Sequence, residues 1–217
     1  MIIDNFDKLA KCLHYLNYEN DNKDKFYMIQ IMTRSKDTGE VPHIYRTMFV
    51  DNKEYLMSHK DMIVKLCEMF NARAYMSVNP SSYKQCSIKM IRELADIIEA
   101  GENTGHYKKI LSLPETVAGK YTCGKDYKLW IIDLDSVKSV DDAVKYIDEI
   151  KAAYDSMYKK NGNVINPKYY QTQMFWVPTV NGSHLLVSPF DKRQFKTLYP
   201  DIEIHDNNPT LLYYNKK

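Results

Sequence analysis

The chain has 217 residues, 44% hydrophobic and 27% charged, a composition typical of a globular protein with room for one large domain or two small modules. Its 30 basic and 28 acidic residues give a formal net charge of +2, which excludes a strongly basic nucleic-acid-binding protein but not a local basic groove. No apolar run approaches the roughly 18 residues of a membrane-spanning helix, and the first residues lack the layout of a signal peptide. The four cysteines are widely spaced, so we expect reduced thiols in a cytoplasmic protein without membrane contact.

Hydrophobic periodicity divides the chain into helices and strands. Apolar residues at helical spacing predict helices, and short apolar or alternating runs bounded by turn residues predict strands. In chain order we expect a helix at 6–16, strands at 26–32 and 45–50, a helix at 58–70, a strand at 72–78, a helix from 81 or 82 to 100, a short helix near 107–111, a strand at 128–135, a helix at 139–159, strands at 170–180 and 184–188, a helix at 192–199, and strands at 202–206 and 210–214. The expected fold class is α+β, with an N-terminal α/β module over residues 1–124 packed with a second module over residues 125–217.

The stretch 129–135 organises the second module, because four apolar residues lead directly into two carboxylates separated by one leucine. Side chains alternate along a strand, so Asp133 and Asp135 point to one face and Trp130, Ile132 and Leu134 to the other. Two like charges on one face of a buried strand repel each other and lose hydration. A hard divalent cation such as Mg²⁺ relieves both problems. The alternative is that one aspartate caps the following helix and the other is solvated.

Two further polar residues fall at defined places on this module. His184 begins the strand after the hairpin turn Asn181-Gly182, and Asp206 ends the strand at 202–206. The order strand, helix, strand, turn, strand, helix, strand indicates a split β-α-β arrangement of the kind found in RNA-recognition-motif-like (RRM-like) folds. The first strand of such a fold is central, so we expect the two aspartates of that strand, His184 and Asp206 to converge on one sheet face.

These motifs resemble those of the archaeo-eukaryotic primase superfamily, which includes phage and plasmid primase-polymerases. That family shows an apolar strand ending in Asp-x-Asp, a Ser-x-His-like motif after a turn, and an apolar-Asp motif. The corresponding stretches here are 129–135, 181–186 and 202–206, and the resemblance covers mainly residues 128 to 214. Two features differ: Ser183 directly precedes His184, and Asn207-Asn208-Pro209 follows the third motif.

The resemblance implies a metal-dependent nucleotidyltransferase of a phage or mobile element, which acts in DNA replication by adding nucleotides to a primer or an initiating nucleotide. Asp133 and Asp135 would hold two Mg²⁺ or Mn²⁺ ions with Asp206 as the third carboxylate, while His184 and Ser183 would contact the triphosphate. The implied partners are a nucleoside triphosphate, single-stranded nucleic acid and a separate helicase or replication protein, in the host cytoplasm if the protein is phage-encoded.

Three of the five arginines lie on the predicted N-terminal strands or at their ends. Arginine matches phosphate geometry, so Arg46 and Arg73, together with Arg34, are candidate nucleotide-binding residues. A solvated strand face explains each of them equally well.

Two other functions fit parts of the sequence. Asp133-Leu134-Asp135 also looks like the start of a haloacid-dehalogenase-type phosphatase, with Asp133 as nucleophile and Asp135 as acid/base. Only some 80 residues follow it, too few for the rest of that doubly wound domain. The other alternative is a catalytically inactive primase-like protein that binds nucleic acid or a host protein.

Overall fold

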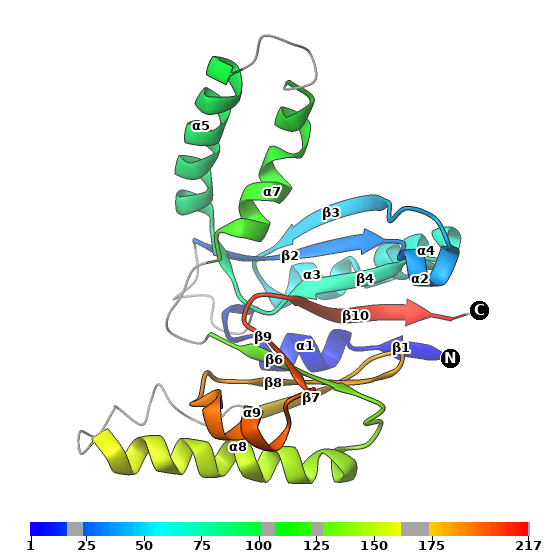
Figure 1. Cartoon of the computed structure of the whole chain (residues 1–217). Coiled ribbons are helices and arrows are strands. Elements are labelled where there is room, and N and C mark those ends of the chain that lie inside the picture. The colour runs from blue at the N-terminus through cyan, green and yellow to red at the C-terminus, as the bar shows by residue number, and fades with distance from the viewer. Residues whose placement is uncertain (17–23, 101–106, 123–127, 162–173, 217) are drawn as a thin grey trace.

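The computed structural model describes residues 1–16, 24–100, 107–122, 128–161 and 174–216, which fold around two antiparallel sheets (Figure 1). The first sheet has the order β1-β10-β4-β2-β3, with β5 paired to β2, and the second has the order β7-β8-β6-β9. Their bounds are β1 Ile2–Asp4, β2 Lys25–Met32, β3 Ile44–Val50, β4 Arg73–Ser77, β5 Ser81–Ser82, β6 Trp130–Asp135, β7 Met174–Pro178, β8 Gly182–Val187, β9 Glu203–His205 and β10 Pro209–Asn215. The α+β class is therefore confirmed. Every strand pairing in the described ranges is antiparallel, which is incompatible with the doubly wound parallel sheet of the phosphatase alternative.

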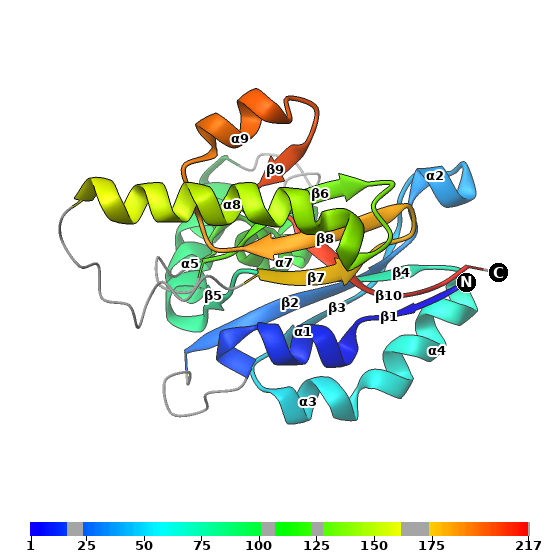
Figure 2. The ribbon, with the colours of Figure 1, turned by 90° about the horizontal axis from the view of Figure 1, so that it is seen from below.

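The helices pack around the two sheets, and α1 lies at their junction, where Phe6 and Leu9 belong to the core that the sheets share. Figure 1 shows α5 and α7 as a hairpin that stands away from the first sheet, and Figure 2 shows α8 running across the second sheet. No helix in the described ranges combines the length and apolar character needed to cross a bilayer. The helical segments are α1 Phe6–Cys12, η1 His14–Leu16, α2 Ser35–Thr38, α3 Lys53–Ser58, α4 Lys60–Phe70, α5 Tyr83–Ala100, η3 Lys108–Ser112, α7 Leu113–Lys120, α8 Val140–Asn161 and α9 Lys192–Leu198.

Strand β6 is central in the second sheet, between β8 and β9. Ile132 and Leu134 on one face pack in a core with Ile150 of α8 and Phe195 of α9. Ile131, on the other face, belongs to the core that the second sheet shares with the first. The alternation expected for this strand is thus confirmed, and it leaves the two aspartates on the face turned away from α8.

The predicted boundary at residue 125 assigned the last strand of the chain to the second module, but this strand lies in the first sheet. β10 pairs with β1 and β4 in the first sheet, so that sheet is built from both ends of the chain. Residues 210–214 are all buried, and a strand that is buried on both faces requires a place inside a sheet. The two modules therefore interlock: the second sheet is formed within residues 130–205, and the chain then returns to the first.

Two buried asparagines tie the sheets together. The Nδ2 of Asn79 donates to the carbonyl oxygens of Leu129 at 2.9 Å and Asp206 at 3.0 Å, and its Oδ1 accepts the Leu129 N–H at 2.8 Å. The Nδ2 of Asn5 donates to the carbonyl oxygens of Pro178 at 2.9 Å and Leu211 at 2.8 Å. These bonds fix β6 and β7 of the second sheet against the first.

Some expected elements differ in extent. The helix expected at 58–70 is preceded by α3, whose N-cap Asn52 accepts the N–H of Tyr55 at 2.7 Å. The short helix expected near 107–111 is followed by α7. The strand expected at 170–180 is present as β7, and its first four residues lie outside the described ranges. Cys12, Cys67 and Cys86 are buried free thiols.

Candidate active site

A cleft of about 710 Å³ lies where the two sheets meet, and the two walls carry opposite charges. Acidic side chains come from the second sheet and its connections, and basic side chains from the end of β2 and from α2. The lining residues are Met32, Arg34, Lys36, Tyr75, Ile131, Asp133, Leu134, Asp135, Tyr146, His184, Asp201, Ile202, Glu203, His205, Asn208 and Pro209.

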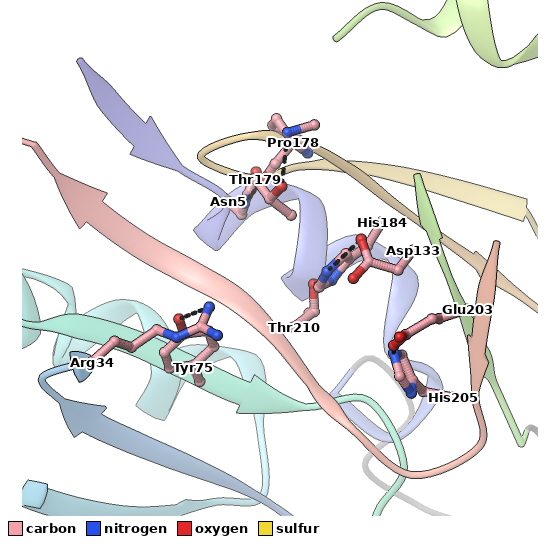
Figure 3. A network of polar contacts seen from close by, with 11 residues as sticks. Asn5, Arg34, Tyr75, Asp133, Pro178, Thr179, His184, Glu203, His205 and Thr210 are labelled. Carbon is pink, nitrogen blue, oxygen red and sulfur yellow. Dashed lines mark hydrogen bonds and ion pairs between the residues drawn. The ribbon is translucent and has the colours of Figure 1, made fainter. Parts of the chain in front are cut away.

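The centre of the acidic wall is a row of side chains across three strands. Asp133 on β6 is opposite His184 on β8 and opposite Glu203 on β9, and directly opposed residues in antiparallel strands share a face. The Nε2 of His205 lies 3.1 Å from Oε2 of Glu203 (Figure 3). Asp135 follows on the same face of β6 and is exposed. The expected convergence of the two aspartates and His184 on one face is therefore observed.

The carboxylate of Asp133 is in an unfavourable place for a negative charge. Its partial burial raises its pKa, and the neighbouring charges of Asp135 and Glu203 raise it further, while His205 and Arg34 act in the opposite direction. Negative charge is thus in excess at this point of the cleft.

His184 is neutral at pH 7. Burial lowers its pKa to about 4, and the positive charges of His205 and Arg34 add to this effect, which Asp135 partly opposes. The Nε2 of His184 is 3.7 Å from Oδ1 of Asp133, too long for a hydrogen bond, and with a neutral ring this contact is not an ion pair. Its Nδ1 is 2.8 Å from Oγ1 of Thr210 on β10.

The basic wall consists of Arg34 and Lys36. The Nη1 of Arg34 donates to the hydroxyl of Tyr75 at 3.4 Å (Figure 3). Arg34 is close enough to the acidic wall to affect the pKa values of Asp133 and His184. Both basic side chains are exposed, so a ligand in the cleft would reach them from solvent.

Two arginines predicted to bind the nucleotide do not line the cleft. Arg73 is buried and makes two charge-assisted bonds to Asp37 of α2, at 2.7 and 2.5 Å, with its guanidinium over the ring of Tyr214. It therefore anchors the helix that carries Lys36. Arg46 is opposite Ile31 across β2 and β3, and thus projects to the face that packs on the helices.

Ser183 also lies away from the cleft. It is opposite Leu134, so it projects toward α8, and it is fully buried with no hydrogen-bond partner for its hydroxyl within the described residues. A residue directly before His184 on a strand must face the other way. The structure therefore does not support the prediction that Ser183 contacts the triphosphate.

Asp206 is not part of the acidic row. Its carboxylate is largely exposed and lies 3.8 Å from Nζ of Lys128, outside the cleft. β9 ends at His205, which is opposite Ile131, so Asp206 comes after the strand has passed Asp133. Glu203, at the other end of β9, occupies the position expected for the third carboxylate.

The donor set suits a hard divalent cation that is also bound by a ligand. Within the described ranges, no three His, Cys, Asp or Glu side chains are grouped closely enough to hold a metal ion by themselves. Mg²⁺ is commonly bound by one or two carboxylates together with waters and substrate phosphates. Asp133 and Asp135 offer that pair, and the pKa of Asp133 is raised first by burial and then by the charges of Asp135 and Glu203, both of which a bound cation would offset.

The sequence did not single out Glu203 or Lys36, although Glu203 lies inside the third motif. The sequence predicts no helix or strand over residues 33–44, so it gives no reason to expect Lys36, which lies in the short helix α2, at the cleft. In comparisons with protein families, curated proteins and solved structures, nothing matches this chain significantly.

Proposed function

We propose that this protein is a metal-dependent nucleotidyltransferase of the primase-polymerase type. Asp133, Asp135 and His184 share one face of a sheet and are opposed across a single cleft by Arg34 and Lys36, and this arrangement carries the proposal. The strand order β7-β8-β6-β9, with α8 after β6 and α9 after β8, supports an RRM-like arrangement of the second sheet.

In this proposal the residues of the two cleft walls have different roles. Asp133 and Asp135 would hold Mg²⁺ or Mn²⁺, which supplies a Lewis acid that stabilises charge on the transferred phosphoryl group. His184, being neutral, would donate a hydrogen bond to a phosphate oxygen rather than accept a proton. Arg34 and Lys36 would hold the triphosphate from the opposite wall. Stabilising and positioning the reacting groups in this way is the main contribution of a protein to phosphoryl-type transfer.

The acidic wall favours an enzyme over an inactive nucleic-acid-binding relic. A surface that only binds a nucleic-acid backbone presents positive charge to it. Asp133, Asp135 and Glu203 would instead repel phosphates unless a cation lay between them. Single-stranded nucleic acid as template and a separate helicase or replication protein as partner belong to the same proposal.

Incorporation of labelled nucleotides on single-stranded DNA and RNA, with Mg²⁺ or Mn²⁺, tests the proposal. Asp133→Asn and Asp135→Asn should abolish turnover, and Asp206→Asn is the matched control that should retain it. Glu203→Gln should reduce turnover, because Glu203 rather than Asp206 is beside Asp133. His184→Ala should raise KM more than it lowers kcat, since it removes a contact made in both ground and transition states.

Two results would contradict the proposal. One is incorporation by Asp133→Asn/Asp135→Asn at the wild-type rate. The other is a wild type that incorporates nothing under any of these conditions and still binds nucleic acid or another protein tightly, which would favour the inactive relative.

A further inference from the structure

Helix α5 belongs to the hairpin that stands away from the first sheet (Figure 1), and it is apolar on two sides. One side packs in the core that α5 forms with α7. The second side faces solvent, and its apolar residues form the outer stripe of α5: Ile88, Ile91, Ala95 and Ile98. The three isoleucines are 43%, 68% and 55% exposed. Single exposed aliphatic residues are ordinary, but a row of them along one helix is a patch of the kind that marks an interaction surface.

The outer stripe has the spacing of a coiled-coil seam. Its residues follow one another at intervals of three, four and three positions, which places them in one line along the helix. The stripe also borders an apolar hollow of about 300 Å³ between α5, η3 and α7, whose lining includes Ile91, Ile110 and Leu113. A second helix laid along α5 would therefore bury the stripe and fill the hollow with an apolar side chain.

The charges of α5 indicate which helix this is. Lys84 lies in the first turn and Glu99 in the last, so each is at the end of the helix where its charge opposes the helix dipole. Lys84 is close enough to Asp24 to lower the pKa of that carboxyl, but neither Lys84 nor Glu99 makes an ion pair with another residue in the described ranges. An antiparallel copy of α5 brings the last turn of one helix beside the first turn of the other. Lys84 then lies beside Glu99 of the partner subunit, and the two outer stripes face each other.

We propose that the protein forms a two-fold symmetric dimer in which the α5 helices of two copies pack antiparallel along their outer stripes. A two-fold interface must be complementary to itself. The outer stripe meets this condition, because its apolar residues are flanked by a basic first turn and an acidic last turn of the same helix. The inference does not depend on the proposed function, since no residue of α5 lines the cleft.

Sedimentation velocity of the full chain over a wide range of protein concentrations measures the oligomeric state, and we expect a dimer whose fraction rises with concentration. Ile91→Glu should raise the dissociation constant by about 10-fold or more, because it places a charge in the apolar interface. Met69→Glu is the matched control: Met69 is 72% exposed on α4, outside the stripe, and its replacement should leave the dissociation constant unchanged.

Charge reversal tests the antiparallel arrangement. Lys84→Glu and Glu99→Lys should each raise the dissociation constant by roughly 3–10-fold, because each places like charges opposite each other twice in the dimer. An equal mixture of the two single variants should associate about as well as the wild type, since every pair across the interface again has opposite signs. An effect of the charges on α5 alone predicts the reverse for the single variants, because each of them suits the helix dipole better than the wild type does.

Three results would overturn the inference. The first is a chain that stays monomeric at every concentration, including one whose outer stripe binds a different protein instead. The second is a dimer that Ile91→Glu leaves intact, which would place the interface elsewhere. The third is a dimer that the single charge variants weaken but their mixture does not restore, which would exclude the antiparallel pairing of Lys84 with Glu99.

Discussion

Replacing Asn79 with alanine should destabilise the protein more than its small size suggests. Asn79 is 3% exposed and makes three hydrogen bonds to backbone groups of Leu129, directly before β6, and of Asp206, directly after β9. Truncation leaves one N–H and two carbonyl oxygens without this partner. Asn79 lies in the connection between β4 and β5 of the first sheet, so the loss falls on the junction between the two sheets.

The magnitude follows from these contacts. A buried polar group left unsatisfied costs about 1–3 kcal/mol, and a carbonyl near solvent regains part of this by binding water. We count the carbonyls of Asp206 and Leu129 at the low end, about 1 kcal/mol each, because a carbonyl has two lone pairs and tolerates the loss of one partner better than an N–H does, and the Leu129 N–H at the full range of about 1–3 kcal/mol. The sum is about 3–5 kcal/mol in the free energy of unfolding, which for a chain of this length lowers Tm by roughly 6–20 °C.

Urea denaturation followed by tryptophan fluorescence measures this difference, since Trp130 lies on β6 itself. Asn207→Ala is the matched control: Asn207 makes one exposed hydrogen bond of 3.3 Å to the carbonyl of Gly119, and its loss should change stability by less than about 0.5 kcal/mol. A loss below about 1 kcal/mol in Asn79→Ala would show that the three bonds do not join the sheets in solution and would refute the reasoning.

Three further perturbations test other parts of the structure. Arg73→Met breaks a buried ion pair and should lower the free energy of unfolding, measured by heat or urea, by about 3–5 kcal/mol. Arg46→Met, on the exposed edge strand β3, should lower it little, and equal effects of the two substitutions would contradict the role of Arg73 as an anchor. Gly182→Ala places a Cβ against the carbonyl oxygen of Leu134 on β6 and 2.8 Å from the backbone N of Ser136, and should cost about 3 kcal/mol or more in the free energy of unfolding. Gly119→Ala, inside α7 with only an ordinary contact at 3.8 Å, should stabilise by roughly 0.5–1 kcal/mol. Burial lowers the pKa of His184 from 6.5 to about 4, so between these pH values the unfolded chain takes up a proton that the folded chain does not, and the stabilisation present above pH 6.5 is lost as the pH falls to 4. The difference in the free energy of unfolding between wild type and His184→Gln should therefore shrink by about 3 kcal/mol from pH 7 to pH 4. An unchanged difference would mean that the histidine is not buried as a neutral ring.

The second sheet could be predicted because its signals are local. Alternation along 129–135 fixed the two faces of β6, and the turn Asn181-Gly182 fixed the hairpin of β7 and β8. The helix at 139–159 followed from its apolar stripe, of which Ile150 and Ala153 share the core with β6 as expected, whereas Val140 and Val144 are exposed. The place of β10 could not be predicted in this way, since its partners β1 and β4 are more than 130 residues away in the chain and periodicity carries no information on pairing.

The residues of the candidate site could be predicted only where the alternation of side chains along a strand decides which face they occupy. Asp133, Asp135 and His184 share a face because their strands alternate and pair in register, and the same rule would have placed Ser183 on the opposite face. The third carboxylate was assigned to Asp206 from motif order, but the register of β9 decides which acid is beside Asp133, and it selects Glu203. Register between distant strands follows from tertiary packing and is not readable from spacing alone.

The division of charge between the sheets explains why the links between them matter for function. Asp133 and His184 come from the second sheet and Arg34 from the first, so no single element sets their separation. That separation depends instead on the polar links made by Asn5, Asn79 and Thr210, all of them buried. A misplacement of about 1 Å between catalytic groups can lower a rate by roughly 100-fold. Because each link joins one sheet to the other, loosening one should, if the proposed function holds, reduce the rate of nucleotide transfer by more than its effect on the folded population alone would.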